Sequence, residues 1–215
     1  MGHRAIDSIR RPFWVEHFSR PFSLLDLGCG DASFTGRSLS TVPLARYHGI
    51  DRSEQALQMA RANTARLFCP TCFSPGDRLD SIRERSEVKE KTFDAILMSF
   101  VLHPFSRDQK DALIGRLHRL LNRTGVVLLI DGVRPQDADR ETSIRRYLAD
   151  VRQRWSRRTR AEYALVEEHI REKDFPETQE TLCACAQKHG FDPVAGLYQD
   201  ALNTTRCLVF HRAAC

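Results

Sequence analysis

Short apolar runs alternate with segments of helical spacing between residues 22 and 131 of this sequence. Residues 24–27, 95–98 and 126–130 are the clearest runs, and weaker ones lie at about 46–50 and 72–74. Short, mostly apolar runs without regular polar alternation are typical of parallel strands covered by helices on both faces. The pattern therefore predicts an α/β fold with a doubly wound, mostly parallel sheet.

The segments between these runs have the features of helices. Residues 5–19 carry an apolar stripe and predict a leading helix, which Pro12 would interrupt. A helix over 53–67 would have a serine as its N-cap, and Ser106 with Gln109 fits a capping box at the start of another. A short helix is predicted at 33–40, and an exposed helix or loop at 81–91.

The pattern changes after Asp131. Residues 138–172 have no strand signal and carry apolar residues at helical spacing, so we expect a helical insertion about twice the usual crossover length. A further helix runs to Gly190, and strands at about 193–199 and 205–211 close the chain. Because their connection is short, these strands are predicted as an antiparallel hairpin at the edge of a seven-stranded sheet.

The length and the apolar content set the expected domain organisation. The 215 residues suffice for a single domain over 1–215, with 1–20 as a leading helix over the site and 138–172 as a helical lid. No apolar run reaches about 18 residues, and the chain starts without a signal-like apolar stretch. Seven cysteines, an odd number, favour reduced thiols, so a cytoplasmic protein is expected.

Arginine supplies most of the positive charge. The formal net charge is +5, and residues 140–171 hold nine arginines against five acids. This segment could bind phosphates, with Trp155 stacking on a base, or the carboxylate of a small acidic substrate. A solvated helix face in an arginine-rich chain is the plainer alternative.

Two cysteine pairs raise the question of a metal site. Cys69 and Cys72 have the spacing of half a zinc site, and Cys183 and Cys185 form a second pair. The pairs lie far apart in the sequence, and no histidine is placed to complete them. We therefore expect thiols without a role in metal binding, and no metal site is predicted.

The stretch from Leu24 to Phe34 carries the first sign of chemistry. An apolar strand ends there in Gly28 and Gly30, with Asp26 two residues before the first glycine. Such glycines allow a tight turn and let the backbone approach a ligand closely. A dinucleotide site needs glycine or alanine at the sixth position of the motif, where this chain has Ser33, so that match is partial.

The same stretch resembles the first motif of the class I S-adenosylmethionine-dependent methyltransferases, acid-x-Gly-x-Gly-x-Gly, with Ala32 in place of the third glycine. The resemblance extends over about 22–211. It implies a Rossmann-like fold, S-adenosyl-L-methionine as the methyl donor and S-adenosyl-L-homocysteine as the product. The methyl group would move by in-line displacement, with alignment and exclusion of water as the main contributions of the protein.

Further motifs follow in the family's order. Asp51, 25 residues beyond Asp26, matches the acid that binds the ribose hydroxyls, and Asp77 matches the acid that contacts the adenine amino group. Asp51 could instead only cap a helix, and Asp77 could be a plain turn residue. The resemblance implies these cofactor-binding residues: Asp26, Gly28, Cys29, Gly30, Asp51, Arg52, Asp77, Arg78, Ser99 and Phe100.

Two residues near the expected methyl group are candidates for catalysis. His103 follows the fourth strand and could be a general base or a substrate ligand, or else a packed histidine before Pro104. Asp131 ends the fifth strand and is expected to face the same crevice.

The lid would select the acceptor. Many small-molecule methyltransferases of this family build a lid at this place, so we expect a small-molecule acceptor, with Tyr147, Trp155 and Tyr163 as candidate walls or as plain helix packing. The weaker alternatives are an RNA or tRNA methyltransferase that uses the arginines of 140–171, and a module that binds the cofactor without turnover. The methylated atom, O, N, S or C, is left open.

Overall fold

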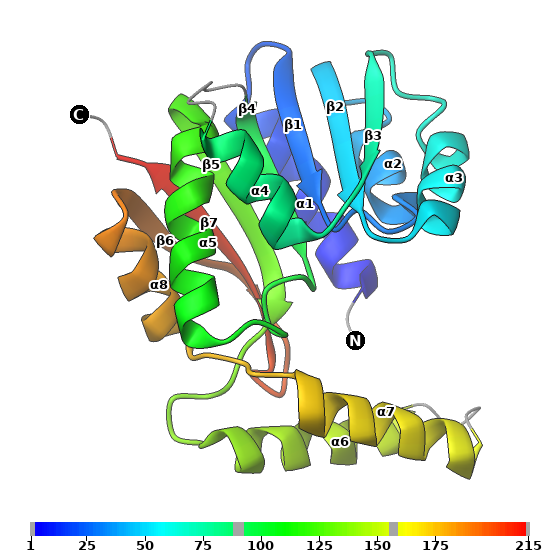
Figure 1. The fold of residues 1–215 in the computed structure, drawn as a ribbon, viewed down its shortest axis with the longest axis vertical. Coiled ribbons are helices and arrows are strands. Elements are labelled where there is room, and N and C mark those ends of the chain that lie inside the picture. The colour runs from blue at the N-terminus through cyan, green and yellow to red at the C-terminus, as the bar shows by residue number, and fades with distance from the viewer. Residues whose placement is uncertain (1–2, 88–92, 155–158, 214–215) are drawn as a thin grey trace.

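A seven-stranded sheet runs through the middle of the protein (Figure 1), whose structure is a computed structural model that describes residues 3–87, 93–154 and 159–213. The strand order is β3-β2-β1-β4-β5-β7-β6, and β7 alone runs against its neighbours in this sheet of described residues. This confirms the predicted mostly parallel sheet with an antiparallel hairpin at its edge. The strands are β1 (Phe22–Leu27), β2 (Leu44–Asp51), β3 (Thr71–Pro75), β4 (Phe93–Ser99), β5 (Leu121–Gly132), β6 (Phe191–Gln199) and β7 (Thr205–Arg212).

Helices cover both faces of the sheet. Figure 1 shows α4, α5 and α8 in front of the strands and α1 behind them. The capping box predicted at Ser106 and Gln109 opens α5, and Ser53 caps α3 as expected. The helices are α1 (His3–His17), α2 (Ser33–Leu39), α3 (Glu54–Asn63), α4 (Arg78–Glu87), α5 (Arg107–Leu120), α6 (Arg140–Arg154), α7 (Arg160–Lys173) and α8 (Gln179–Lys188).

The apolar runs of the sequence divide between two cores. Along β4, Ile96 and Met98 belong to the cluster under α5 and α8, whereas Ala95 and Leu97 belong to the cluster under α1 and α2. Successive side chains of a strand point to opposite faces, so a strand buried on both faces has no polar position to alternate with. This is the physical reason why the central strands read as continuous apolar segments.

The leading helix differs from the prediction at one point, because α1 continues through Pro12. Trp14 is fully buried and stacks on Phe22 of β1 with 5.5 Å between ring centroids, and Ile6 is 1% exposed in the same cluster. Apolar contacts on both sides of the proline hold the helix together despite the hydrogen bond that proline cannot donate.

Two helix boundaries also differ from the sequence prediction. The helix that starts after Ser53 ends at Asn63, and the hydroxyl of its C-cap residue Thr64 donates to the carbonyl of Ala60. The charged stretch predicted from residue 81 is a helix that starts earlier, at Arg78. Its last predicted residues, 88–91, lie outside the described part of the chain.

The stretch predicted as a helical insertion forms a hairpin of α6 and α7. The two helices lie side by side beyond the carboxyl ends of the strands (Figure 1). Ile144, Leu148 and Ile170 form a small core of their own, against which Tyr147 and Tyr163 pack. Among the described residues, no helix is both long and apolar enough to cross a membrane.

Candidate active site

The glycine turn joins β1 to α2 and lies against the end of β2. Gly28 and Gly30 have φ angles of 75° and 54°, a conformation that favours glycine. The amides of Gly28 and Cys29 both donate to the carbonyl of Ile50, at 2.7 and 3.0 Å. A Cβ on Gly30 would point into open space, so a ligand can reach the backbone of this turn.

Asp51, the last residue of β2, lies beside the glycine turn. Its Oδ2 accepts a hydrogen bond from the amide of Gly30 at 3.0 Å, and its Oδ1 accepts one from the amide of Ser53 at 2.9 Å. A carboxylate has about four lone-pair sites, so acceptor capacity remains for a pair of hydroxyl groups. Asp51 can therefore support the start of α3 and bind a ribose at the same time.

Asp26 lies inside the sheet, beneath the turn. It is 1% exposed, and its Oδ2 accepts a hydrogen bond from the hydroxyl of Tyr47 at 2.8 Å. Burial raises the pKa of Asp26, although hydrogen bonds from Tyr47 and Thr35 act in the opposite direction. Burial also raises the pKa of the Cys29 thiol, which is therefore neutral. Asp26 anchors β1 to β2 below the turn.

Asp77 and Arg52 lie on the loops that follow β3 and β2. Nη1 of Arg52 is 3.9 Å from Oδ2 of Asp77, and both side chains are largely or partly exposed. Oδ1 of Asp77 accepts a hydrogen bond from the amide of Leu79 at 2.8 Å, so Asp77 also supports the start of α4. The side chain of Arg78 lies outside the described part of the chain.

Ser99 and Phe100 stand at the end of β4. Phe100 has a φ angle of 57°, which is rare for a bulky residue, and its amide donates to the carbonyl of Ile130 at 2.7 Å. The hydroxyl of Ser99 accepts a hydrogen bond from Nη2 of Arg10 at 2.8 Å, and Arg10 is buried on α1. The leading helix thus brings a guanidinium group to the same sheet edge.

A cavity of about 360 Å³ lies between this sheet edge and the helical hairpin. Its exposed wall is mostly apolar, with two histidines and a carboxyl group among the polar lining residues. No lysine or arginine lines it among the described residues. The lining residues are Phe100, His103, Gly132, Val133, Ser143, Ile144, Tyr147, His169, Ile170, Asp174, Pro176, Thr204 and Thr205.

His103 is held by Asp131 from the side away from the cavity. Nδ1 of His103 lies 2.5 Å from Oδ1 of Asp131, which is 2% exposed. The Asp131 carboxylate also accepts hydrogen bonds from the amides of Val101, Leu102 and Gly132, at 3.0, 2.5 and 2.7 Å. Because this carboxylate only accepts, Nδ1 of His103 carries a hydrogen, and Nε2 of the neutral ring is free to take a proton.

Asp131 is therefore placed differently from the expectation that it faces the crevice. It does not line the cavity, because its oxygens are occupied by His103 and the surrounding amides. The group that does line the cavity is Asp174, in the connection from α7 to α8. Its Oδ1 is buried without a hydrogen-bond partner, 3.7 Å from Nε2 of His103. Burial raises the pKa of Asp174.

The three aromatic residues predicted as acceptor walls have different positions. Tyr147 lines the cavity, and burial raises the pKa of its hydroxyl to about 12. Tyr163 is not among the lining residues, because it packs in the hairpin core and its hydroxyl donates to the carbonyl of Leu148 at 3.0 Å. Trp155 lies outside the described residues.

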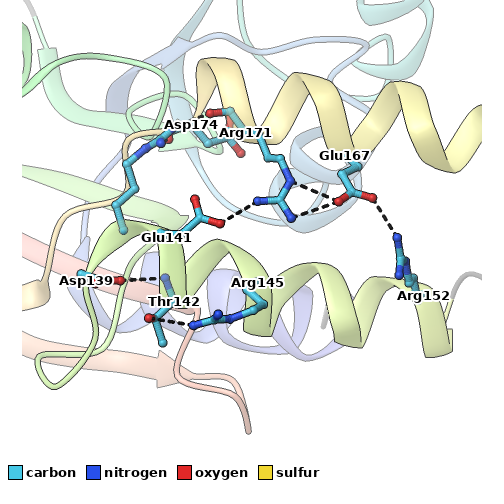
Figure 2. A network of polar contacts seen from close by, with 9 residues as sticks. Asp139, Glu141, Thr142, Arg145, Arg152, Glu167, Arg171 and Asp174 are labelled. Atoms are coloured by element: carbon cyan, nitrogen blue, oxygen red, sulfur yellow. Dashed lines mark hydrogen bonds and ion pairs between the residues drawn. The ribbon is translucent and has the colours of Figure 1, made fainter.

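Some of the arginines of residues 140–171 form ion pairs within the hairpin (Figure 2). Oε2 of Glu167 lies 2.9 Å from Nη2 of Arg152, and its Oε1 lies 3.0 Å from Nη2 of Arg171. Arg171 also reaches Glu141 at 2.8 Å. Arg140 donates to the carbonyls of Asp174 and Arg171. These contacts favour the plainer interpretation of the segment, a charged helix surface that holds α6 and α7 together.

The cysteine pairs form no metal site in the part of the chain that the structure covers. No group of three or more histidine, cysteine or acidic side chains is placed to hold a metal ion among those residues. Cys69, Cys72, Cys183 and Cys185 are all free thiols.

The chain is similar to known proteins over the strands that form this sheet edge. A family model described as "Methyltransferase domain" matches residues 25–127, which run from the glycine turn to the middle of β5. The matched part, just under half of the chain, is similar to the class I S-adenosylmethionine-dependent methyltransferases. The matched range includes the glycine turn, Asp51 and Asp77, the residues that the sequence predicts to bind the methyl donor.

The relatives of this chain are longer proteins. "O-methyltransferase 3" of Dictyostelium discoideum is 27% identical over 117 residues, which make up 53% of this chain and 26% of that protein. The malonyl-[acyl-carrier protein] O-methyltransferase of Halalkalibacterium halodurans is 29% identical over 131 residues, 60% of this chain and 45% of the relative. The aligned parts therefore span less than half of either relative.

A similar fold occurs in a solved structure. The pyocyanin biosynthetic protein PhzM superposes with a TM-score of 0.61 at 19% identity, covering 96% of this chain and 55% of PhzM. This supports the Rossmann-like fold.

The residues of the sheet edge fit the cofactor of the family. Gly30 offers an open backbone, Asp51 has acceptor capacity, and Phe100 borders both the end of β4 and the cavity. Sequence reasoning missed Asp174 and His169 in the cavity wall and Arg10 beside Ser99. The sequence Asp174-Phe-Pro-Glu177 separates two helical patterns and so marks this connection, but nothing in the sequence places Asp174 beside His103.

Proposed function

We propose that this protein is a methyltransferase (EC 2.1.1.-) that uses S-adenosyl-L-methionine to methylate a hydroxyl oxygen of a small molecule. The observation that carries this proposal is the orientation of His103. Its Nδ1 is bonded to the buried Asp131, and the ring also lines the cavity at the sheet edge. A hydroxyl nucleophile starts protonated, so a base at this place has a purpose.

The protonation behaviour of His103 suits a general base. Burial favours the neutral ring, but the carboxylates of Asp131 and Asp174 outweigh burial and raise the pKa of His103 above its ordinary value. A raised pKa makes Nε2 a stronger acceptor for the proton of an acceptor hydroxyl. Asp131 acts as a positioning residue, since it fixes the tautomer and neutralises the ring once it is protonated.

The cofactor supplies a methyl group that is already activated by its positive sulfur. The glycine turn and Asp51 orient the donor. The hairpin and Phe100 exclude water from the cavity, and His103 takes the proton of the acceptor hydroxyl. Arg52 and Asp77 are assigned to the adenine end of the same site, because they follow β2 and β3.

The cavity wall favours an uncharged, partly apolar acceptor. About 360 Å³ is in the range of sites for small organic molecules. Asp174 would repel a carboxylate placed beside His103, and none of the described lining residues is a lysine or arginine that could offset this repulsion. Phenol-like hydroxyl compounds are therefore better acceptors in this proposal than carboxylic acids. The relative from Halalkalibacterium halodurans, by its name, methylates a malonyl group, so the two proteins would differ at this point.

The test is transfer of label from methyl-labelled S-adenosylmethionine to two matched acceptor sets, phenolic hydroxyls and carboxylic acids, with cofactor binding measured by calorimetry. We expect transfer to members of the first set and a loss of at least about 100-fold in His103→Ala. His211→Gln is the control, because His211 is paired with Val126 near the middle of β5, five residues before Asp131. Tight cofactor binding with no transfer to either set would favour a module without turnover.

A further inference from the structure

Lys110 of α5 is a lysine in an unusual place. It is 2% exposed, on the helix that covers the sheet beside His103, although lysine is almost never fully buried without a partner. Its Nζ donates a hydrogen bond to the carbonyl of Phe175, in the connection from α7 to α8. This side chain has no part in the methyl-transfer site described so far.

The segment that Lys110 contacts, residues 174–177, is fixed from two sides. The amide of Phe175 donates to the carbonyl of His103 at 2.8 Å, and the amide of Arg134 donates to the carbonyl of Glu177 at 3.1 Å. The segment carries Asp174, whose Oδ1 lies 3.7 Å from Nε2 of His103. The bond from Lys110 is therefore one of a few contacts that set the position of Asp174 relative to His103.

Charge around Lys110 is mainly negative. The carboxylates of Glu177, Asp131 and Asp174 all act on its ammonium group, and they oppose the effect of burial, which lowers the pKa of Lys110. Two of these carboxylates, Asp131 on β5 and Asp174, also act on His103. Further basic side chains nearby are Arg134, 3.9 Å from Glu177, and Arg140 and His169, which both act on Asp174.

We propose that Lys110 is a positioning residue that fixes the segment 174–177 against the His103 loop and balances the buried carboxylates behind His103 with one positive charge. The inference rests on the proposed function only where it concerns turnover. A methionine of similar length would fill the same volume but would leave the Phe175 carbonyl without its donor. It would also leave the two carboxylates that act on His103 without their buried counter-charge.

Three variants distinguish the two proposed roles of Lys110, the hydrogen bond to Phe175 and the positive charge. Lys110→Met removes the donor and the charge, Lys110→Gln keeps a donor without the charge, and Lys110→Arg keeps both. Lys188→Met is the matched control, because Lys188 pairs with Asp111 on the surface and its side chain is 65% exposed. Folding of each variant is checked by its thermal transition.

The first measurement is the titration of the His103 ring by NMR, in protein without acceptor. Loss of the charge should raise the pKa of His103 in Lys110→Met and Lys110→Gln by roughly one unit, and leave it unchanged in Lys110→Arg and Lys188→Met. The second is amide exchange at residues 174–177, which should accelerate about tenfold or more in Lys110→Met only.

An unchanged His103 titration in folded Lys110→Gln would overturn the charge role, and unchanged exchange in Lys110→Met would overturn the fixing role. If Lys110→Met does not fold, Lys110→Gln and Lys110→Arg still decide the charge role, and the fixing role is read from exchange in Lys110→Ala. Neither measurement uses turnover, so they can succeed where the methyl-transfer assay fails, and the reverse.

Discussion

Nδ1 of His103 lies 2.5 Å from Oδ1 of Asp131, and the two residues come from separate strand ends. Asp131→Asn keeps the shape but replaces an oxygen that only accepts with a group that can also donate. We expect the ring to lose its fixed tautomer and methyl transfer to fall at least about tenfold, with little change in cofactor binding. Single-turnover rates and calorimetry on the same variant measure both quantities, and full activity would remove Asp131 from the mechanism.

The pH profile reports the charge around His103. Only the neutral ring can take a proton, so kcat/KM should rise with pH through a pKa above the ordinary value of 6.5. Asp174→Asn removes a negative charge that raises this pKa, and the rising limb should therefore move to lower pH. Lys110→Gln should move it to higher pH. If Asp174→Asn and Lys110→Gln both moved the rising limb in the same direction, the assignment of this limb to His103 would be contradicted.

Cofactor binding depends on Asp51. Asp51→Ala should weaken binding of S-adenosylhomocysteine by at least about tenfold, because two charge-assisted hydrogen bonds to the ribose would be lost. Asp31→Ala, on the same turn, is the control, since Oδ1 of Asp31 accepts a hydrogen bond from the amide of Ser33 at the start of α2. Calorimetric titration of both variants measures their affinity for S-adenosylhomocysteine. Equal affinities would show that the ribose does not bind to Asp51.

The hairpin should loosen without unfolding the protein when its ion pairs are removed. Glu167→Gln breaks the contacts to Arg152 and Arg171 shown in Figure 2. Both pairs are partly exposed, so the thermal midpoint should change little, while amide exchange in α7 should become several-fold faster. High salt should produce the same change in the unmodified protein. A large drop in the midpoint would show that the pairs support the whole fold.

The fold could be predicted because its main signal is local. Buried strands such as β4 are apolar on both faces, and the helices between them carry caps such as Ser106, so neighbouring residues determine each element. The helix α1 was harder to predict, because what keeps it intact at Pro12 is the packing of Trp14 on a strand that comes later in the chain.

The candidate site was predictable only in part. Asp51 and the glycines follow strand ends, and a doubly wound sheet brings its strand ends to one edge. Asp174 and Lys110 do not follow this rule, because a backbone hydrogen bond between Phe175 and His103 places one, and the packing of α5 buries the other. Contacts between residues about 70 positions apart leave no pattern in a single sequence.

The carbonyl of His103 and the amide of Phe175 share a hydrogen bond, so the exit of the hairpin is tied to the loop that carries the histidine. Under the proposed function, a displacement of α7 would stretch this bond and move the loop that holds the ring beside Asp131. The position of the hairpin and the orientation of the proposed base would then be coupled through one backbone hydrogen bond.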